Sequence, residues 1–117
     1  MPQKVILIVD DAAEFTTLVG EILEQDGYKV VIAGSSYEAL AAFGLEERID
    51  LVLIDANLPG ASGMELREAL ERLRPGVKLA YVTGMAGKPN GTDTPVLYKP
   101  FAPEAVSRLV KSLIGDA

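Results

Sequence analysis

The sequence predicts an α/β fold, a doubly wound five-stranded parallel sheet with helices on both faces. Short apolar segments alternate along the chain with longer segments whose apolar residues recur at helical spacing. The short segments are apolar nearly throughout, as in "VILIV" at 5–9, a pattern typical of parallel strands that are buried on both faces. Five such repeats joined by right-handed crossovers give a (βα)5 domain, for which we expect the strand order 2-1-3-4-5.

The five expected strands are short, mainly apolar runs. They are Lys4–Val9, Tyr28–Ala33, Asp50–Asp55, Val77–Thr83 and Pro95–Tyr98. The stretch between the last two, "GMAGKPNGTDT" at 84–94, holds three glycines and a proline and lacks an apolar stripe. We therefore expect the fourth helix to be short, irregular or absent.

The other helices have clearer patterns. The first covers about 12–25 and ends before an Asp-Gly pair. Ser35 with Glu38, and Ser62 with Glu65, have the spacing of a capping box and should open the next two helices. A proline at 103 suits the first turn of the last helix. The residues expected to face inward from these later helices are Ala39, Leu40, Phe43, Leu66, Ala69, Leu70, Leu73, Val106, Leu109, Val110 and Leu113.

Composition limits both the size and the chemistry of the protein. Its 117 residues, of which 49% are hydrophobic, suit one domain spanning residues 1–117. The chain has no cysteine and no histidine, which excludes disulfides, thiolate or imidazole metal sites and histidine-activated nucleophiles. The net charge of −6 argues against a nucleic-acid partner, and no apolar run reaches the length of a membrane span. Because the N-terminus has no signal-peptide pattern, we expect a cytoplasmic protein.

Three carboxylates fall at the ends of two strands that this fold makes neighbours. Asp10 and Asp11 follow the first strand and Asp55 ends the third, so all three should meet in the crevice at the carboxyl edge of the sheet. A single aspartate in such a place is more often a helix cap, but Asp55 is followed by a turn and not at once by a helix. Clustered like charges need a counter-ion, and hard oxygen donors favour Mg²⁺.

The next two strands end in groups of a different kind, the hydroxyl of Thr83 and the ammonium of Lys99. Either residue alone would be unremarkable, since lysine is common on surfaces. Carboxylates with a metal, a hydroxyl donor and a lysine are together suited to hold a phosphoryl group. Because the chain lacks histidine and cysteine, we expect the nucleophile to be a carboxylate.

Four short motifs occur in order at these strand ends. They are "VDD" at 9–11, "DANLPGASG" at 55–63, "VTG" at 82–84 and "KPF" at 99–101. With them the chain resembles the receiver domain of bacterial two-component response regulators, the CheY-like family. The resemblance implies a phosphoacceptor switch that is not an enzyme beyond self-catalysed phosphotransfer and autodephosphorylation. Asp55 would take the phosphoryl group from a histidine kinase or a histidine phosphotransfer protein. The implied Mg²⁺ ligands are Asp10, Asp11, Asp55 and the backbone carbonyl of Asn57.

The resemblance also implies roles for the other strand ends. Lys99 would pair with the phosphoryl group, its bond to Pro100 would be cis, and Thr83 would move toward the phosphoryl group to carry the signal. Asn57 and Met85 occupy the two positions that flank the path of the attacking water in this family. We predict that these two residues set the lifetime of the phosphorylated form.

The chain departs from the family pattern in two places. The switch aromatic of the family lies three residues before the lysine, where this chain has Val96. Tyr98 points to the same face by strand alternation and could substitute, although packing is the favoured explanation for it. The segment "YVTGMAG…PVLYKPF" resembles in part the stand-alone receivers with a FATGY-type motif, which often serve kinases of the HWE/HisKA2 type. In that subclass a mobile loop replaces the fourth helix, and activation would order the loop instead of shifting a helix.

Several alternatives stand beside a single-domain response regulator. The chain could be a receiver excised from a hybrid sensor histidine kinase, and it could be a monomer or a weak dimer. A more distant alternative is a Mg²⁺-dependent phosphohydrolase, which commonly needs a second acid where this chain has Asn57, and also a cap domain. A catalytically silent interaction module is disfavoured because every expected site residue is present. These residues are Asp10, Asp11, Asp55, Thr83 and Lys99.

Overall fold

Five parallel strands form the sheet of the computed structural model, which describes residues 3–46, 48–56, 58, 63–84 and 94–116. The strands are β1 (Val5–Val9), β2 (Lys29–Ala33), β3 (Leu51–Asp55), β4 (Leu79–Thr83) and β5 (Val96–Tyr98). They pair in the order β2-β1-β3-β4-β5. The predicted fold class and strand order are therefore confirmed, and each strand ends at the predicted residue.

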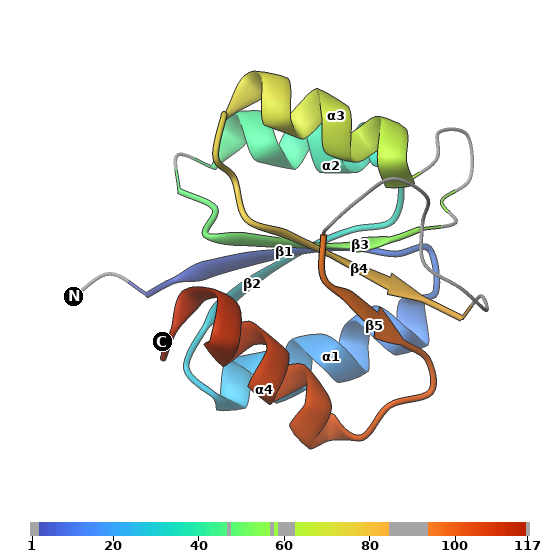
Figure 1. The fold of residues 1–117 in the computed structure, drawn as a ribbon, viewed down its shortest axis with the longest axis vertical. Coiled ribbons are helices and arrows are strands. Elements are labelled where there is room, and N and C mark those ends of the chain that lie inside the picture. Colours follow the sequence, from blue (N-terminus) through green and yellow to red (C-terminus); the bar gives the residue numbers. More distant parts are fainter. Residues whose placement is uncertain (1–2, 47, 57, 59–62, 85–93, 117) are drawn as a thin grey trace.

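The helices cover the sheet in two layers. α2 (Ser36–Leu45) and α3 (Gly63–Leu73) lie on one face, and α1 (Ala13–Gln25) and α4 (Pro103–Ile114) lie on the other (Figure 1). Among the described residues no helix lies between β4 and β5, and residues 85–93 fall outside the described part, so the irregular or missing fourth helix stays a prediction. None of the helices in the described part is both long enough and apolar enough to span a bilayer.

The central strands are buried because helices cover both faces of the sheet. Every residue of β1, β3 and β4 is buried, which explains why these strands show no alternation of apolar and polar residues. Phe43 and Tyr81 are the largest buried side chains on the α2–α3 face, and Tyr28 is the largest on the α1–α4 face. These two apolar layers hold the carboxyl ends of β1 and β3 side by side.

The helix starts agree with the predicted signals, with one displacement. Ser35 caps α2, because its Oγ accepts a hydrogen bond from the N–H of Glu38 at 3.1 Å. Glu38 accepts from the N–H of Gly34 at 2.6 Å and not from that of Ser35, so the predicted capping box is shifted by one residue on this side. Pro103 occupies the first turn of α4, as predicted. Ser62, the predicted cap of α3, lies outside the described residues.

The predicted apolar stripe of α3 is wrong at its last residue. Leu73 is 60% exposed, whereas Leu66 and Leu70 are buried. The residue that covers the end of α2 is Arg74, whose guanidinium carbon lies 4.3 Å from the centroid of the Phe43 ring. The same guanidinium donates hydrogen bonds to backbone carbonyls at that helix end. An aromatic face and the last carbonyls of a helix attract a planar cation more than an aliphatic side chain, which leaves Leu73 outside.

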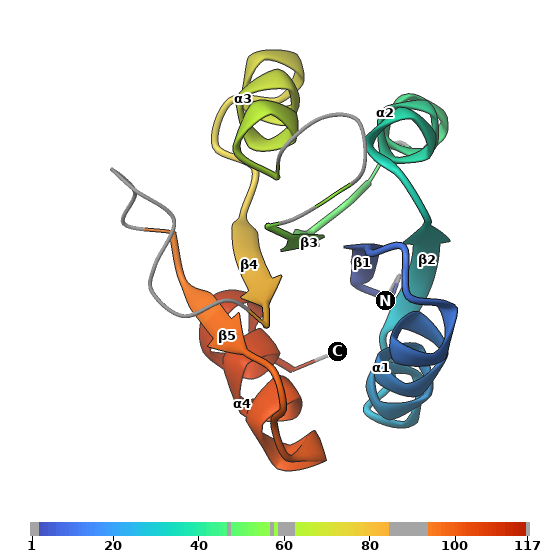
Figure 2. The same ribbon diagram turned by 90° about the vertical axis from the view of Figure 1, so that its right-hand side faces the viewer.

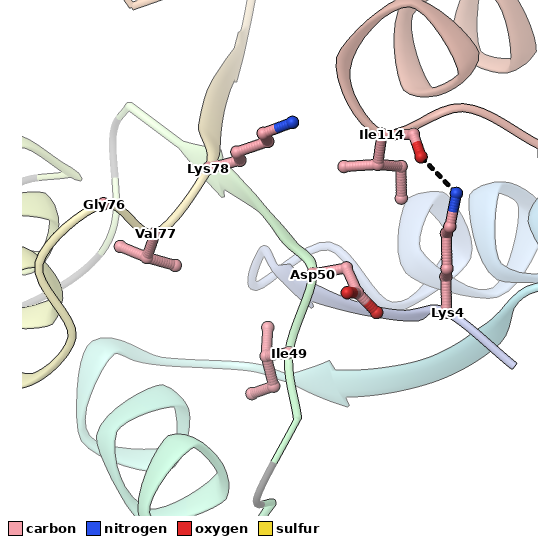
Figure 3. Close-up of a pocket in the computed structure, with 7 residues that line it drawn as sticks. All are labelled: Lys4, Ile49, Asp50, Gly76, Val77, Lys78 and Ile114. Atoms are coloured by element: carbon pink, nitrogen blue, oxygen red, sulfur yellow. Dashed lines mark hydrogen bonds between the residues drawn. The ribbon is translucent and has the colours of Figure 1, made fainter. Parts of the chain in front are cut away.

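Side chains at the amino end of the sheet hold the C-terminal end of α4. Lys4 donates to the carbonyl of Ile114, and Lys78 donates to the carbonyl of Leu113 at 2.7 Å. Figure 3 shows Lys4, Lys78 and Ile114 around a hollow of about 260 Å³. Cations at the last carbonyls of a helix interact favourably with its macrodipole. The lysines of this hollow therefore have a structural role.

Candidate functional site

Three carboxylates meet at the carboxyl end of the sheet. β1 and β3 pair in parallel with Val9 opposite Ile54, so the residues that follow them, Asp10 and Asp55, lie side by side. One oxygen from each of Asp10, Asp11 and Asp55 lies within 4.8 Å of the others. Figure 2 looks onto this end of the sheet, where β1 and β3 are neighbours. The three acids that the sequence places at strand ends therefore share one site.

The three carboxylates differ in their surroundings. Asp10 is 2% exposed and Asp55 is 8% exposed, whereas Asp11 is exposed. Asp10 Oδ1 accepts a hydrogen bond from the N–H of Ala12 at 2.9 Å. Ala12 is the N-cap residue of α1, and its side chain forms no capping hydrogen bond. Asp10 therefore supports the turn before α1 without occupying the cap position, which weakens the alternative that it is an ordinary helix cap.

Lys99 brings a positive charge to this site. Its N–H donates to the carbonyl of Thr83 at 2.8 Å, which places the end of β5 beside the end of β4. Its Nζ lies 2.8 Å from Asp10 Oδ2, and the Asp10 side chain is 1% exposed while that of Lys99 is 27% exposed. The Lys99–Pro100 bond is cis, so this prediction from the resemblance is confirmed. Lys99 thus enters the acidic cluster through its contact with Asp10.

The donor set of this cluster fits a hard divalent cation. The cluster offers carboxylate oxygens, and the chain has no cysteine or histidine to add softer ligands. Carboxylates at these separations can converge on one small cation, and Mg²⁺ characteristically completes its octahedral shell with water. A divalent charge would also offset the repulsion between the three carboxylates. The residues present therefore suit the Mg²⁺ site that the resemblance implies.

The hydroxyl-bearing residue expected at the end of the fourth strand lies at the same edge. Thr83 is the last residue of β4 and is 1% exposed. In the β3–β4 register Asp55 pairs with Val82, so Thr83 lies one residue further along this edge. This position is suitable for a hydroxyl that would donate to a group bound at Asp55.

The two residues of β5 considered for the switch have different environments. Val96 pairs with Tyr81 and packs against the core on the α2–α3 face. Tyr98 pairs with Thr83 and is 39% exposed. Because alternate residues of a strand share a face, Tyr98 lies on the same side of the sheet as Val96. Its role as a substitute for the family's switch aromatic stays a prediction.

Two predicted residues lie outside the described part of the chain. Asn57 is expected to contribute a carbonyl ligand and to tune dephosphorylation, and Met85 is expected to act with it. Both roles stay predictions. The same holds for the resemblance to the FATGY-type subclass, because residues 85–93 of its distinguishing loop, which spans 84–94, lie outside the described part.

Phe15 packs against the core on the α1–α4 face and also lies beside Lys99, a contact that was not predicted from the sequence. The Lys99 Nζ lies 4.1 Å from the centroid of the Phe15 ring. Phe101 meets this ring edge-to-face, with centroids 5.6 Å apart and planes at 75°. A signal for the pair was present in the sequence, because Phe15 falls in the first turn after the acid pair and Phe101 directly follows the Lys-Pro pair.

Gly63, the last residue of "DANLPGASG", has a structural role that the motif alone did not reveal. A Cβ at this position would lie 2.8 Å from the carbonyl oxygen of Asp55 and 2.9 Å from the Cα of Ala56. The N–H of Gly63 donates to the carbonyl of Ala56 at 3.3 Å. Glycine therefore allows α3 to begin directly against the end of β3, which carries the candidate acceptor.

Fold and site together define a doubly wound domain with an acidic cluster, suited to a divalent cation, at its topological switch point. Comparison with known proteins identifies the family. The family model of the response regulator receiver domain matches residues 6–111. The chain belongs to this family and is a receiver domain of two-component response regulators, so the resemblance seen in the sequence is confirmed.

The chain is similar to one part of several longer regulators. It is 35% identical to the transcriptional regulatory protein ResD of Bacillus subtilis, over 96% of this chain and 48% of ResD. It is also 35% identical to the phosphate regulon transcriptional regulatory protein PhoB of Pseudomonas aeruginosa, over 93% of this chain and 51% of PhoB. The chain thus spans about half the length of these curated relatives.

Solved structures share the fold across nearly their whole length. A CheY-like receiver domain protein of Methanospirillum hungatei superposes with a TM-score of 0.85 at 37% identity, covering 95% of this chain and 93% of that chain. The response regulator TrrA of Thermotoga maritima, solved in complex with Mg²⁺-BeF, superposes with a TM-score of 0.85 at 28% identity, covering 95% and 99%. These similarities confirm the fold class.

Proposed function

We propose that this chain is a phosphoacceptor switch in which Asp55 receives a phosphoryl group from the phosphohistidine of a histidine kinase or a phosphotransfer protein. The observation that carries the proposal is the convergence of Asp10, Asp11 and Asp55 within 4.8 Å at a site that Lys99 enters. Membership of the receiver family and a solved relative in complex with Mg²⁺-BeF support it. The proposed functional unit comprises residues 1–117.

Asp55 acts as the nucleophile of this reaction. It ends β3, is largely buried, and is held beside Asp10 by the pairing of β1 and β3. One carboxylate oxygen attacks phosphorus in line with the leaving imidazole, so that a P–O bond forms, the P–N bond breaks and the imidazole nitrogen keeps the electron pair. When bound, Mg²⁺ supplies positive charge to the phosphoryl oxygens. The residues proposed to hold it are Asp10, Asp11, Asp55 and, through its carbonyl, Asn57.

Lys99 and Thr83 recognise the phosphoryl group. The Lys99 ammonium already lies 2.8 Å from Asp10 Oδ2, so it can donate to a phosphoryl oxygen on Asp55 after a short movement. Thr83, one register position beyond Asp55, donates its hydroxyl to another phosphoryl oxygen and carries the signal to β5. Val96 and Tyr98 are the residues through which this shift changes the contacts made at the edge of the sheet.

Hydrolysis of the acyl phosphate returns the switch to its resting state, and Asn57 and Met85 tune the rate of this step. The chain thereby changes its contacts with other proteins and does not turn over an external substrate. A single-domain response regulator is the favoured context, and a receiver belonging to a hybrid sensor histidine kinase is the alternative. No observation on the described residues favours the phosphohydrolase alternative.

The proposal is tested by incubating the chain with acetyl phosphate and Mg²⁺ and measuring its intact mass. We expect the native chain to gain one phosphoryl group, and we expect no gain for Asp55→Asn or when Mg²⁺ is left out. Asp50→Asn is the matched control, because it removes an aspartate at the opposite end of the sheet, and it should be phosphorylated as the native chain is. Uptake by Asp55→Asn at the native rate, or no uptake by the native chain, would contradict the proposal.

A further inference from the structure

The rim of the acidic site contains an aromatic pair that the mechanism above does not use. Phe15 lies in the first turn of α1, and Phe101 follows the Lys99–Pro100 bond. The two rings meet edge-to-face at 5.6 Å, and the Lys99 Nζ lies 4.1 Å from the Phe15 ring centroid. The ammonium therefore has two electrostatic partners here, the ring of Phe15 and the carboxylate of Asp10.

These two partners respond differently to a bound cation. Asp10 is also a proposed metal ligand, so a divalent cation draws on the same carboxylate that holds Lys99 at 2.8 Å, and it repels the ammonium. Mg²⁺ prefers oxygen donors, so it does not compete for the face of the Phe15 ring. The attraction between a ring face and an ammonium is independent of the Asp10 carboxylate. The ring is thus the partner that Lys99 keeps when Asp10 binds the metal.

Lys99 needs such a partner because its side chain is flexible and open to water. The side chain is 27% exposed, and a lysine ammonium is strongly hydrated at the end of a four-carbon stem. A weakened contact with Asp10 would therefore let the ammonium turn toward solvent. Phe101 holds the Phe15 ring in place, because the two form an edge-to-face pair and both pack against the core on the α1–α4 face.

We propose that Phe15 is a positioning residue for phosphoryl transfer, whose ring keeps the Lys99 ammonium at the site while Asp10 binds the metal. This role rests on the proposed function of Asp55 as phosphoryl acceptor. Phe15 acts only through Lys99, so its contribution should disappear when the ammonium is removed. If Phe15 had only a structural role in the core, its substitution would have the same effect with and without the Lys99 ammonium.

The rate of phosphorylation by acetyl phosphate at saturating Mg²⁺ tests this role in the full chain. We expect Phe15→Leu to lower the rate of phosphorylation by about three- to tenfold. Phe15→Tyr keeps an aromatic face and should keep a rate close to that of the native chain. In a Lys99→Met background, Phe15→Leu should have no further effect. Leu18→Ala is the control, because it shortens an exposed apolar side chain at the same rim and should keep the native rate.

The NMR spectrum of isotope-labelled lysine side chains separates positioning from packing. The Cε protons of Lys99, assigned through Lys99→Met, should resonate upfield of those of the other lysines, because the Nζ bonded to this Cε lies 4.1 Å from the centroid of the Phe15 ring. Phe15→Leu should remove this shift while the rest of the spectrum stays that of a folded chain, and Phe15→Tyr should keep it. This measurement does not require phosphoryl transfer.

Three results would overturn the proposed role of Phe15. They are a native phosphorylation rate in Phe15→Leu, the same loss of rate with and without the Lys99 ammonium, and an unshifted Lys99 signal in the native chain. Failure of the proposed function is recognised separately, because the native chain itself would then take up no phosphoryl group. If the native chain takes up no phosphoryl group, the positioning role of Phe15 is wrong as well, even if the Lys99 signal is shifted.

Discussion

At the amino end of the sheet, Lys4 and Lys78 donate to the last carbonyls of α4, while Asp50 accepts from the N–H of Val5 at 2.7 Å and pairs with Arg48. At the carboxyl end, three carboxylates lie within 4.8 Å of one another and a lysine contacts one of them. Both ends combine lysine and aspartate. At the amino end these charges lie apart, each with a helix carbonyl, a backbone N–H or an opposite charge as its partner. At the carboxyl end Asp10 also has an N–H and a lysine as partners, but three carboxylates lie together there.

This difference separates charges that stabilise the fold from charges that are gathered for binding. A cation at a helix C-terminus lowers the free energy of the folded state modestly. Carboxylates brought together raise the free energy of the folded state through mutual repulsion, and a bound cation would offset that repulsion. Placement and not residue type therefore distinguishes the two ends. If this division is correct, a substitution at one end should leave the characteristic property of the other end unchanged.

The largest effect is expected for Asp10→Ala, measured as the affinity for Mg²⁺ by isothermal titration calorimetry. The change removes a proposed ligand, so the Kd for Mg²⁺ should rise at least about tenfold, a loss typical even of outer-shell partners of a metal. Asp50→Ala provides the comparison at the amino end and should keep the native Kd. If the Kd for Mg²⁺ rose equally in both variants, the proposed division between the two ends of the sheet would be wrong.

Gly63→Ala should have the next largest effect, on the free energy of unfolding in urea. The added Cβ would lie 2.8 Å from the carbonyl oxygen of Asp55, so we expect a loss of about 1–3 kcal/mol from overpacking at the carboxyl end. Gly44→Ala in α2 is the matched control, because a Cβ there meets nothing within 4 Å. Alanine is favoured in a helix, so this control should gain about 0.5–1 kcal/mol. A native free energy of unfolding in Gly63→Ala would show that the start of α3 does not need to lie this close to the backbone at the end of β3.

Tyr28→Phe should lower stability by about 1 kcal/mol at neutral pH, because the Tyr28 hydroxyl donates to the carbonyl of Gly115 at the amino end. Burial raises the pKa of the Tyr28 phenol above its usual value near 10, and the carboxylates of Asp116 and Asp26 raise it further. The folded state therefore resists deprotonation more than the unfolded state does. The resulting stability is fully present below about pH 10 and is lost as the pH rises through the folded-state pKa.

Urea unfolding at a series of alkaline pH values measures this dependence. We expect Tyr28→Phe to lose less stability above about pH 10 than the native chain, because one buried phenol no longer titrates. Tyr37→Phe is the control, since Tyr37 is 82% exposed, and its profile should follow that of the native chain. If the free energy of unfolding of Tyr28→Phe depended on alkaline pH as that of the native chain does, titration of the Tyr28 phenol would not be the cause of the loss.

The smallest effect is expected for Lys4→Met. Loss of the cation at the end of α4 should lower the free energy of unfolding by about 0.3–1 kcal/mol. The rate of phosphorylation by acetyl phosphate should stay that of the native chain, since Lys4 lies at the opposite end of the sheet. A slower rate in this variant would show that the two ends are coupled.

Much of the fold was predictable because the signals for it are local. Apolar runs of strand length and helices with an apolar stripe are read from neighbouring residues, and every strand ends where the sequence indicates. Asp10, Asp11 and Asp55 were predictable as one site because parallel strands bring their carboxyl ends to one edge. Leu73 was wrongly placed because its spacing is correct for the helix, whereas its burial depends on what packs beyond the helix end.

The sequence by itself determined the order of elements and the chemical groups that arrive at the carboxyl edge of the sheet. Only the tertiary structure decided that Lys99 contacts Asp10, that Phe15 lies against the Lys99 ammonium, and that no Cβ fits at Gly63. The physical reason is that these contacts join residues from different strands and helices. Their distances depend on how the helix layers pack on the sheet, and the periodicity of residues along the chain does not determine that packing.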